Sequence, residues 1–388
     1  MDGKNSTNQR KPESRKVVRT FATASFLNDM GSDIIYPIWP LFVTQVLKAN
    51  MTALGFLDGV GNALVSISKA ASGYFSDRLK KRKAFIWVGY LFGSLSRIGY
   101  ALSSVWTHLI PFRILDRSGK IRAAPRDAYI ADVSTRKNRG KNFGFLRALD
   151  HLGAVCGIII CIVFFRLLGY RILFALASIP SLISALLIFL LIKERKTRKL
   201  KLYKGLSLKD LDENFKLFLF LSALFSLGAF SYSFLLIYAK EFGFKTTFVP
   251  LLYLIFTVVA SLMSFPLGRL SDKWGRKHLI FISFILWGSV LICLILGQSY
   301  ATVIISFVLY GAHRGALEPV QKTFVSELAP QKFRASSLGA YQMITGLFTF
   351  PASFVAGILW ESIGMLGPFY FSLALTTVAS LLLVFVKS

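Results

Sequence analysis

Several signatures are missing from this sequence, and each absence removes a class of activity. No G-x-x-x-x-G-K-[S/T] phosphate loop occurs in the 388 residues, which argues against direct ATP hydrolysis. No G-x-S-x-G nucleophile motif occurs either, and the cysteines show no metal-ligand spacing. We therefore expect no enzyme activity, no cofactor and no metal site.

Cysteine is scarce, and a cleavable signal peptide is absent. Cys156, Cys161 and Cys293 all lie in long apolar runs, where buried packing is the expected role. The first apolar run carries Asp29 and Asp33 and is too long for a signal peptide. We expect this run to be a membrane span.

Acidic residues are few, since 19 Asp and Glu against 46 Lys and Arg give a formal net charge of +27. A soluble nucleic-acid-binding protein would explain that charge, but 54% of the residues are hydrophobic. They form a dozen stretches of bilayer-spanning length, which a soluble protein does not need. We predict an all-α membrane protein with twelve transmembrane helices in a lipid bilayer and no nucleic-acid partner.

The predicted spans fall into two groups of six. They lie near 18–47, 52–75, 84–104, 106–132, 142–168, 170–192, 217–239, 247–267, 278–297, 299–328, 335–360 and 366–386. We expect a basic cytoplasmic tail at 1–17, an amino-terminal half at 18–192, a cytoplasmic linker at 193–216 and a carboxyl-terminal half at 217–388.

Lys and Arg concentrate in alternate loops, and the linker 193–216 is the richest of them. Because positive loops remain cytoplasmic, we place both termini and the linker inside a cell (inner or plasma) membrane. The basic loops are also expected to bind anionic lipid headgroups. Within the linker, residues 207–215 fit a short amphipathic surface helix or a plain tether, and the tether is favoured.

One segment of the chain occurs twice, 195 positions apart. The sequence GYFSDRLKKRK at 73–83 returns as GRLSDKWGRK at 268–277, each time between two apolar runs. Other matches keep the same offset, for example Arg139 with Arg334. A set of matches in one register indicates a duplicated unit rather than chance. Two such halves rocking about a shared centre is how many secondary transporters work.

The repeated hairpin resembles the loop signature of the major facilitator superfamily, G-x-L-[A/S]-D-[R/K]-x-G-R-[R/K]. The second copy at 268–277 fits almost completely, whereas the first has Lys80 in place of a glycine. With twelve spans in two halves, the resemblance covers nearly the whole chain. It implies two pseudo-symmetric six-helix halves and a transport function.

The resemblance also implies that the hairpins are gates. Asp77 would face the start of helix 11 and Asp272 the start of helix 5, because a carboxylate accepts hydrogen bonds at the positive end of a helix. The glycines would let helices 2 and 8 approach their neighbours. The simpler alternative is a solvated loop that only sets topology. The gating candidates are Gly73, Asp77, Arg78, Gly268, Asp272 and Arg276.

Two further resemblances are weaker. Gly144, Gly153 and Gly157 match the spacing of an antiporter motif in helix 5, but Ile158 stands where that motif has proline. Ordinary packing of small residues is the alternative. The stretch 113–127 resembles a branch of uncharacterised prokaryotic members, which supplies no substrate.

Ionisable residues within the spans form the candidate site, because such residues usually face a protein interior or a water-filled cavity. Asp29 and Asp33 share a face of helix 1. In helix 4, steps of 100° put most charges of 113–127 on one face and Arg122 and Arg126 opposite. A structural ion-pair network between helices 1, 4 and 5 is the alternative. The proton or substrate candidates are Asp29, Asp33, Arg113, Asp116, Arg117, Lys120, Arg147, Asp150, His151 and Glu318.

The preferred hypothesis is a monomeric secondary active transporter that moves a small solute by alternating access, coupled to protons. An Asp that gains and loses an Arg partner would bind and release a proton. The excess of cations in helix 4 favours an anionic or zwitterionic solute. A non-transporting receptor or sensor on the same scaffold and an ion-independent facilitator are the alternatives.

Overall fold

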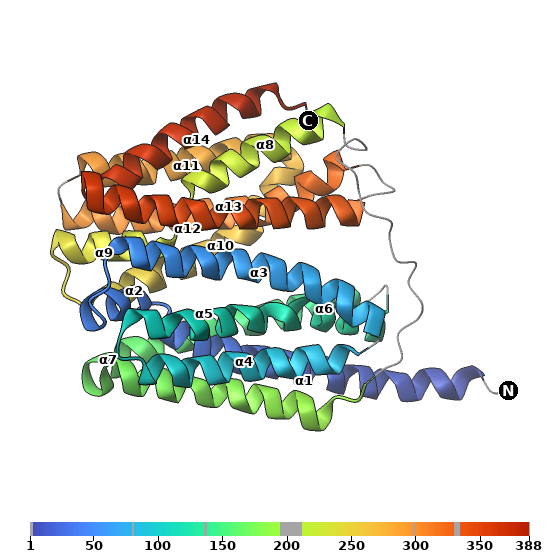
Figure 1. The fold of residues 1–388 in the computed structure, drawn as a ribbon. Helices are drawn as coiled ribbons and strands as arrows, with labels where there is room; N and C mark the ends of the chain where they lie inside the picture. The colour runs from blue at the N-terminus through green and yellow to red at the C-terminus, as the bar shows by residue number, and fades with distance from the viewer. Residues whose placement is uncertain are drawn as a thin grey trace. The chain divides into compact units, whose positions relative to one another are not determined.

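The fold is given by a computed structural model (Figure 1), which describes residues 3–79, 81–135, 138–194, 212–297, 299–329 and 334–387. Side chains within these ranges are described except at 3–14, 77 and 334–336. The Asp77 carboxylate, Lys80, most of the amino-terminal tail and most of the linker therefore lie outside the described residues.

Long helices alternate with short 3₁₀ and π segments. The first half contains α1 (Gly3–Ile35), α2 (Trp39–Leu41), the π-helix η1 (Phe42–Val46), α3 (Met51–Leu79), α4 (Arg82–Leu102), the 3₁₀ turn η2 (Trp106–His108), α5 (Leu109–Ser118), the 3₁₀ turn η3 (Gly119–Arg122), α6 (Ala123–Val133) and α7 (Arg139–Leu191). The second half contains α8 (Glu213–Gly228), α9 (Tyr232–Phe242), α10 (Val249–Trp274), α11 (Arg276–Leu296), α12 (Tyr300–Leu328), α13 (Arg334–Ile363) and α14 (Gly367–Phe385).

These helices account for the twelve predicted spans and confirm the all-α fold. The first span is α1 with α2 and η1, the fourth is α5 with η3 and α6, and the seventh is α8 with α9. α7 contains both the fifth and the sixth span. Gly169 breaks it with φ 66° and ψ −173°, at the predicted boundary. The described ranges contain no strand.

Seven helical stretches of the described residues have the length and hydropathy to cross a membrane. They are 51–76, 139–191, 213–242, 249–274, 276–296, 337–363 and 367–385. The remaining spans are α1, α4, α5 with α6, and α12, which carry most of the intramembrane charges. The charges lower the hydropathy of these helices, so their polar faces must be covered by protein.

The duplication is also visible in the helix boundaries. α3 ends at Leu79 and α10 at Trp274, while α6 ends at Val133 and α12 at Leu328. Each pair of ends is 195 positions apart, the offset of the sequence repeat. The two halves therefore repeat their helix ends as well as their hairpins.

The chain divides into two compact units. Unit 1 comprises 1–38 and 67–201, and unit 2 comprises 39–66 and 202–388. The boundary falls inside α3, so the first half of this helix contributes to the unit that contains the carboxyl-terminal helices.

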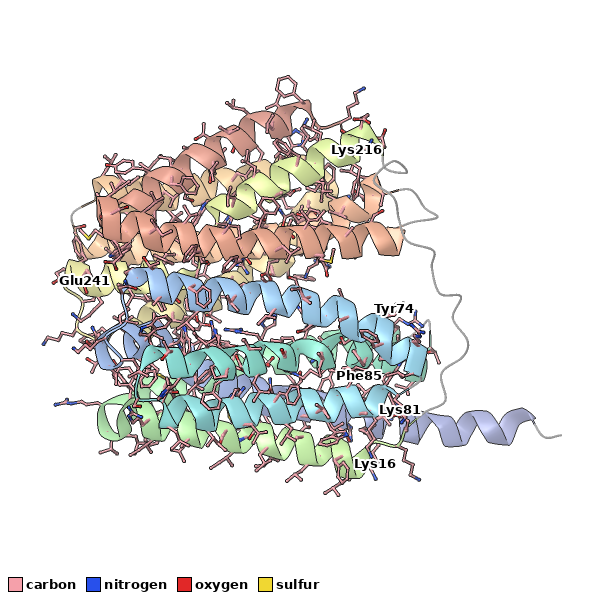
Figure 2. The ribbon with its side chains drawn as sticks, in the orientation of Figure 1. Lys16, Tyr74, Lys81, Phe85, Lys216 and Glu241 are labelled. Atoms are coloured by element: carbon pink, nitrogen blue, oxygen red, sulfur yellow. The ribbon has the colours of Figure 1, made fainter. Side chains whose placement is uncertain are left out.

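Each unit has a buried core of its own. In unit 1, Phe21 of α1 lies against Tyr129 of α6, with ring centroids 5.2 Å apart, and Ile188 of α7 belongs to the same cluster. In unit 2 the core is aromatic, and Phe225 of α8 stacks on Phe284 of α11 at 4.1 Å. Figure 2 shows how densely side chains fill the spaces between helices. These cores hold the charged helices in place.

Candidate functional site

α1 approaches the first part of α7 closely at two glycines. A Cβ atom at Gly153 would stand 2.3 Å from the Phe26 carbonyl oxygen, and one at Gly157 would stand 2.2 Å from that of Met30. Only glycine permits such an approach of two helix backbones. The glycines of the antiporter-like spacing thus have a packing role, and they bring Asp29 of α1 against the charged helix.

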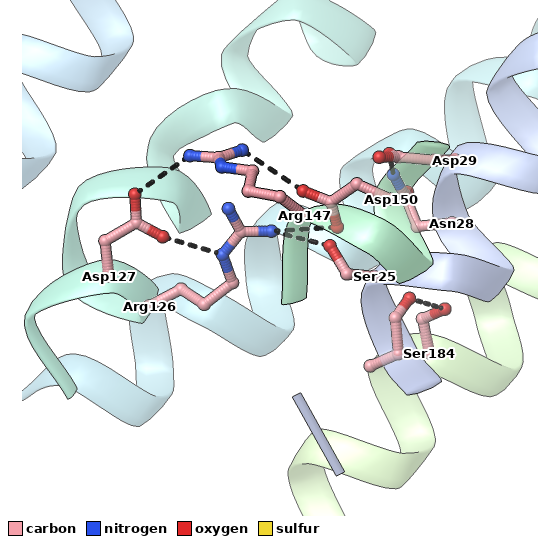
Figure 3. A network of polar contacts seen from close by, with 9 residues as sticks. Ser25, Asn28, Asp29, Arg126, Asp127, Arg147, Asp150 and Ser184 are labelled. Carbon is pink, nitrogen blue, oxygen red and sulfur yellow. Dashed lines mark hydrogen bonds and ion pairs between the residues drawn. The ribbon is translucent and has the colours of Figure 1, made fainter. Parts of the chain in front are cut away.

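Four charged side chains of α6 and α7 form a closed ring (Figure 3). Arg126 donates from Nε to Asp127 Oδ1 at 3.0 Å, and its Nη1 lies 3.9 Å from Asp150 Oδ1. Arg147 reaches the same carboxylates, with Nη1 3.1 Å from Asp150 Oδ2 and Nη2 3.5 Å from Asp127 Oδ2. Each carboxylate lies between two guanidinium groups, so the formal charges of the ring cancel.

Asp150 has one oxygen that the ring leaves open. Its Oδ2 accepts from Arg147, whereas the buried Oδ1 has no hydrogen-bond partner among the described residues. Arg126 Nη1 donates instead to Ser25 Oγ of α1, at 2.6 Å. A buried carboxylate oxygen with open lone pairs requires an explanation, and a proton that binds there is one.

Asp29 of α1 lies in a cationic environment. Its Oδ1 accepts a hydrogen bond from Asn28 Nδ2 at 2.9 Å, a contact that Figure 3 includes. Its charge also interacts with those of Arg97, Lys120 and Arg126. These three cations belong to α4, η3 and α6, so the positive charges near Asp29 come from other helical segments.

Arg97 of α4 is a buried cation that the candidate set did not include. It donates to the carbonyl oxygens of Ala177 at 2.8 Å and Asn28 at 3.2 Å. It also donates to the Ser32 hydroxyl at 2.7 Å and to that of Ser181. Arg97 therefore joins α4 to α1 and α7. The signal for it was a single arginine in an otherwise apolar span.

α5 carries the next group of candidates. The Arg117 guanidinium lies over the Tyr36 ring, 5.1 Å from its centroid, and Nη1 donates to the Tyr36 hydroxyl at 3.2 Å. Arg117 Nε lies 3.4 Å from Asp116 Oδ2, so the acidic partner is the neighbouring residue. Arg113 and Asp33 are both buried. These contacts connect α5 to the end of α1.

Lys120 lies in η3, the 3₁₀ turn between α5 and α6. Such a turn advances by about 120° per residue, so residues beyond it do not continue a face drawn with 100° steps. The four residues of η3 thus shift the later positions by about 80°, which brings Arg126 from the opposite side toward the face of Arg113. Asp127 pairs with Arg126 in the ring. The Lys120 ammonium itself is half-buried and has no hydrogen-bond or ion-pair partner among the described residues.

The other two candidates are not members of the ring. His151 is exposed on α7, and Glu318 of α12 is exposed and paired with Arg314. A buried ionisable residue of α12 is His313, whose Nδ1 lies 2.8 Å from the Ser283 carbonyl oxygen. The charge chemistry of the described residues thus gathers in the amino-terminal half, as the sequence indicated.

Two acidic side chains contact the beginning of α4, the helix that follows the first hairpin. Glu194, just after α7, accepts from the backbone N–H groups of Arg82 at 2.8 Å and Lys83 at 3.0 Å. A carboxylate there stabilises the positive end of α4. The Arg82 side chain pairs with Asp132 at the end of α6.

The second hairpin has an equivalent pair. Arg276 lies 2.9 Å from Asp272 and 3.0 Å from Glu327 at the end of α12. Gly275 has φ 89°, which explains the glycine of the signature at this turn. Lys277 Nζ caps α14 by donating to its carboxyl-terminal end, at 2.8 Å from the Val384 carbonyl oxygen. Glu327 and Asp132 were both missed, although the offset of 195 relates them.

The glycines that open the two hairpins do not support close packing here. A Cβ at Gly73 would stand 3.6 Å from the Ala124 Cβ, an ordinary contact, and one at Gly268 would meet no described atom within 4 Å. The packing reason given for these glycines is therefore wrong for this arrangement. Arg78 donates to the Tyr74 hydroxyl of its own helix at 3.2 Å.

Comparison with known proteins bears directly on the family. The family model of the Major Facilitator Superfamily matches residues 21–219 and again 217–388. An uncharacterised MFS-type transporter of Methanocaldococcus jannaschii is 34% identical over 392 residues, which covers 99% of this chain and 97% of that protein. The chain belongs to the major facilitator superfamily. It is an integral membrane transport protein of that type.

The names of more distant relatives of this superfamily member state a function. Multidrug resistance protein 1 of Bacillus subtilis is 24% identical and covers 90% of this chain and 91% of its own length. Among solved structures, a nucleoside transporter aligns with a TM-score of 0.80 at 13% identity, covering 96% of this chain and all of that one (100%). A D-xylose–proton symporter aligns with 0.74 at 18% identity, covering 97% and 98%. The structural likenesses show the fold.

Proposed function

We propose that this superfamily member is a proton-coupled secondary transporter that works by alternating access. The observation that carries the proposal is the buried Oδ1 of Asp150, which accepts no hydrogen bond in the described chain although two guanidinium groups lie nearby. The ring of four charges is neutral only while Asp150 is ionised. A proton on Asp150 would leave Arg126 and Arg147 with one carboxylate between them.

That imbalance supplies a physical link between a proton and a helix movement. Arg126 already contacts Ser25 of α1 and lies in the field of Asp29. When Asp150 is neutral, the attraction of Arg126 to α7 weakens and its attraction to α1 remains. Proton binding is thereby expected to change how α1 and α7 hold α6, and a change of this kind drives the exchange between two states of a transporter.

For the solute we propose a small anion or zwitterion, with Lys120 as its first cationic contact. Lys120 is half-buried, and among the described residues no carboxylate lies within hydrogen-bond or ion-pair distance of its ammonium group, although Asp29 and Asp116 act on it at longer range. Because an ammonium group without a contact partner is costly within a membrane span, a negatively charged solute group would stabilise it. Arg117 lies three residues earlier and is held by Tyr36.

The second candidate function is export of amphiphilic organic compounds. It is favoured by the similarity to Multidrug resistance protein 1 and by the aromatic character of unit 2. Tyr232, Tyr253 and Phe256 form one such group, with centroids 5.2 Å apart for the two tyrosines. Aromatic rings bind apolar and cationic molecules, whereas they give little attraction to a small anion.

A binding panel separates the two candidates. Purified protein is tested for thermal stabilisation by anions, sugars, drugs and siderophores, and Lys120→Gln is compared with Lys141→Gln, an exposed lysine at the start of α7. Stabilisation by an anion that Lys120→Gln loses by about tenfold in affinity, with Lys141→Gln unchanged, supports the first candidate. Stabilisation by drugs alone, equal in both variants, supports the second.

We also propose the membrane orientation and division of the chain given by the loop charges. Both termini and the linker 193–216 are cytoplasmic, and the protein is a multi-pass monomer of the cell membrane. The first half ends at 192 and the second begins at 217. On this orientation, the loop between η1 and α3 lies on the outer side.

A further inference from the structure

The first half of α3 and the middle of α13 approach each other closely within unit 2. A Cβ at Gly55 would stand 2.1 Å from the Ser353 carbonyl oxygen, and one at Gly59 would stand 2.7 Å from that of Phe350. On the facing helix, a Cβ at Gly357 would stand 2.5 Å from the Met51 carbonyl oxygen. Small residues at four-residue spacing on both helices permit this contact.

The beginning of α3 is fixed to the same partner. The backbone N–H of Met51 donates to Glu361 Oε1 of α13 at 2.6 Å. The Asn50 side chain accepts from the N–H of Ala53 at 2.9 Å, which caps the first turn of α3. The contact of α3 with α13 thus extends from the first turn of α3 to Ser66, whose hydroxyl occupies the space beside Gly346.

Asp58 lies within this contact and is almost completely buried, with 2% of its surface exposed. Its Oδ1 accepts from Trp39 Nε1 at 2.9 Å, and its Oδ2 accepts from Ser231 Oγ at 2.7 Å and from the Ser233 hydroxyl. Hydrogen bonds to a charged group are stronger than those between neutral groups. One carboxylate therefore holds α3 to α2 and to the start of α9.

The serines that bind Asp58 lie at a break in the seventh span. α8 ends at Gly228 and α9 begins at Tyr232. Ser231 caps α9 by accepting from the N–H of Ser233, and its own N–H donates to Ser353 Oγ of α13 at 3.2 Å. The Asp58 carboxylate, the break and α13 thus belong to one buried polar cluster.

We propose that Asp58, with Trp39, Ser231 and Ser233, is the lock that holds the outer end of the transporter closed. The inference rests on alternating access as proposed above. The residues 39–66 belong to unit 2 by contact but to the amino-terminal half by sequence. For the two halves to separate at the outer end, α3 must leave α13 and α9, and the Ser231 and Ser233 donors of Asp58 must be exchanged for water, whereas Trp39 lies in the same 39–66 segment and can stay bonded.

Asp58 suits a lock better than an apolar residue would. A buried carboxylate with three donors in place is stable, but the same carboxylate with one donor missing is destabilised, so partial opening is disfavoured. Full opening restores hydration. The lock therefore has two stable states, one closed and one in which water hydrates the carboxylate, and partly open intermediates are rare. Asp58 is a positioning residue in this account, because it acts through α3 and α9 rather than on the solute.

The first test measures how easily the closed contact opens. In a variant with Cys156, Cys161 and Cys293 replaced by alanine, Ser353→Cys is labelled with an impermeant maleimide from outside intact cells. Ser353 is fully buried, so slow labelling is expected. Adding Asp58→Asn is expected to raise the labelling rate about tenfold, the effect of losing one strong hydrogen bond. Labelling at the parental rate would overturn the lock.

Matched variants guard against general loosening of the fold. Ser231→Ala with Ser233→Ala removes two donors and leaves the carboxylate, and is expected to raise the rate as Asp58→Asn does. Ser306→Ala removes a buried serine of α12 whose one hydroxyl contact among the described residues is with Thr302 of its own helix, and should leave the rate unchanged. An equal rise in Ser306→Ala would show that any buried serine matters, which contradicts a specific lock.

The second test keeps Asp58 intact and prevents opening. Phe56 of α3 and Phe354 of α13 have ring centroids 6.3 Å apart. Phe56→Cys with Phe354→Cys is bridged by a short bifunctional thiol reagent, and solute counterflow is measured before bridging, after it and after reduction. Counterflow that stops on bridging and returns on reduction supports the lock. Counterflow unaffected by complete bridging means that α3 never leaves α13.

Neither readout depends on protons, because labelling needs no gradient and counterflow is downhill. If the lock fails while proton coupling is observed, only this inference is lost. If the lock holds while no pH effect on transport is found, alternating access stands and the coupling role of Asp150 is lost.

Discussion

Asp132 and Glu327 occupy equivalent positions, 195 residues apart, and each pairs with an arginine that follows its hairpin. The arginines themselves do not align, since Arg82 corresponds to Lys277 and Arg276 to Lys81. Each half thus keeps an ion pair between its hairpin and the end of a later span, which is the fourth span in the first half and the tenth in the second. The arginine of the pair differs by one position between the two halves.

The two pairs should differ in how much they contribute to stability. Asp132→Asn removes the carboxylate that pairs with the nearly buried Arg82 guanidinium, whereas Glu327→Gln removes one from the more exposed Arg276, which keeps Asp272. Because Asp132 itself is half-exposed, the expected loss is only about 1 kcal/mol, and smaller still for Glu327→Gln. Thermal unfolding of both variants in detergent measures this. A larger loss in Glu327→Gln would mean that Asp272 does not support Arg276.

The hairpins should also act on the transport rate. If Asp77 latches the cytoplasmic side, Asp77→Asn lowers transport several-fold with normal abundance in the membrane, because a neutral amide interacts weakly with a helix dipole. Asp272→Asn should have the smaller effect, since Asp272 is exposed and bonded to Arg276 of its own hairpin. Initial transport rates normalised to membrane protein test this. Transport at the parental rate in both variants would mean that the hairpins only set the membrane topology.

The membrane orientation can be tested with two lysines. Lys204 lies in the linker, and Lys48 is exposed in the loop before α3. On the proposed orientation, an impermeant thiol reagent added to intact cells labels Lys48→Cys and fails to label Lys204→Cys until the cells are opened. The reverse result would invert the topology and would place both hairpins on the outer side.

Much of this fold followed from local patterns in the sequence. Apolar runs located the twelve spans, Gly169 marked the break between the fifth and sixth, and Gly275 has the backbone conformation that its signature requires. Such features depend on a few neighbouring residues, so one sequence is sufficient to find them.

The arrangement of the charges did not follow, because it depends on contacts between helices. The 3₁₀ turn η3 changes the phase of the fourth span by about 80°, and this brings Arg126 toward the face that carries Arg113. The partner of Asp150 is set by the distance between α6 and α7, which no periodicity encodes. The contact of α3 with α13 was equally invisible in the sequence, because it depends on which helix faces Gly55 and Gly59.

The central claim is that Asp150 binds the coupled proton, and Asp127 is its matched control. Both are acidic members of the same ring, and each accepts one hydrogen bond and makes one longer ion-pair contact, but Asp150 Oδ1 is buried whereas the Asp127 side chain is 34% exposed. Asp150→Asn and Asp127→Asn therefore perturb the ring alike and differ in the proton site. Asp29→Asn and Asp33→Asn extend the comparison to helix 1, where we expect at least one variant to lose coupling.

The deciding measurement is proton movement into proteoliposomes, followed with an internal pH-sensitive dye while the solute identified in the binding panel flows down its gradient. We predict a solute-dependent pH change for the parent and for Asp127→Asn. For Asp150→Asn we predict normal abundance, solute binding and counterflow, with the pH change reduced to background and uphill accumulation lost. A full pH change in Asp150→Asn, or misfolding of both ring variants, would contradict the claim and make the ring a structural ion-pair network.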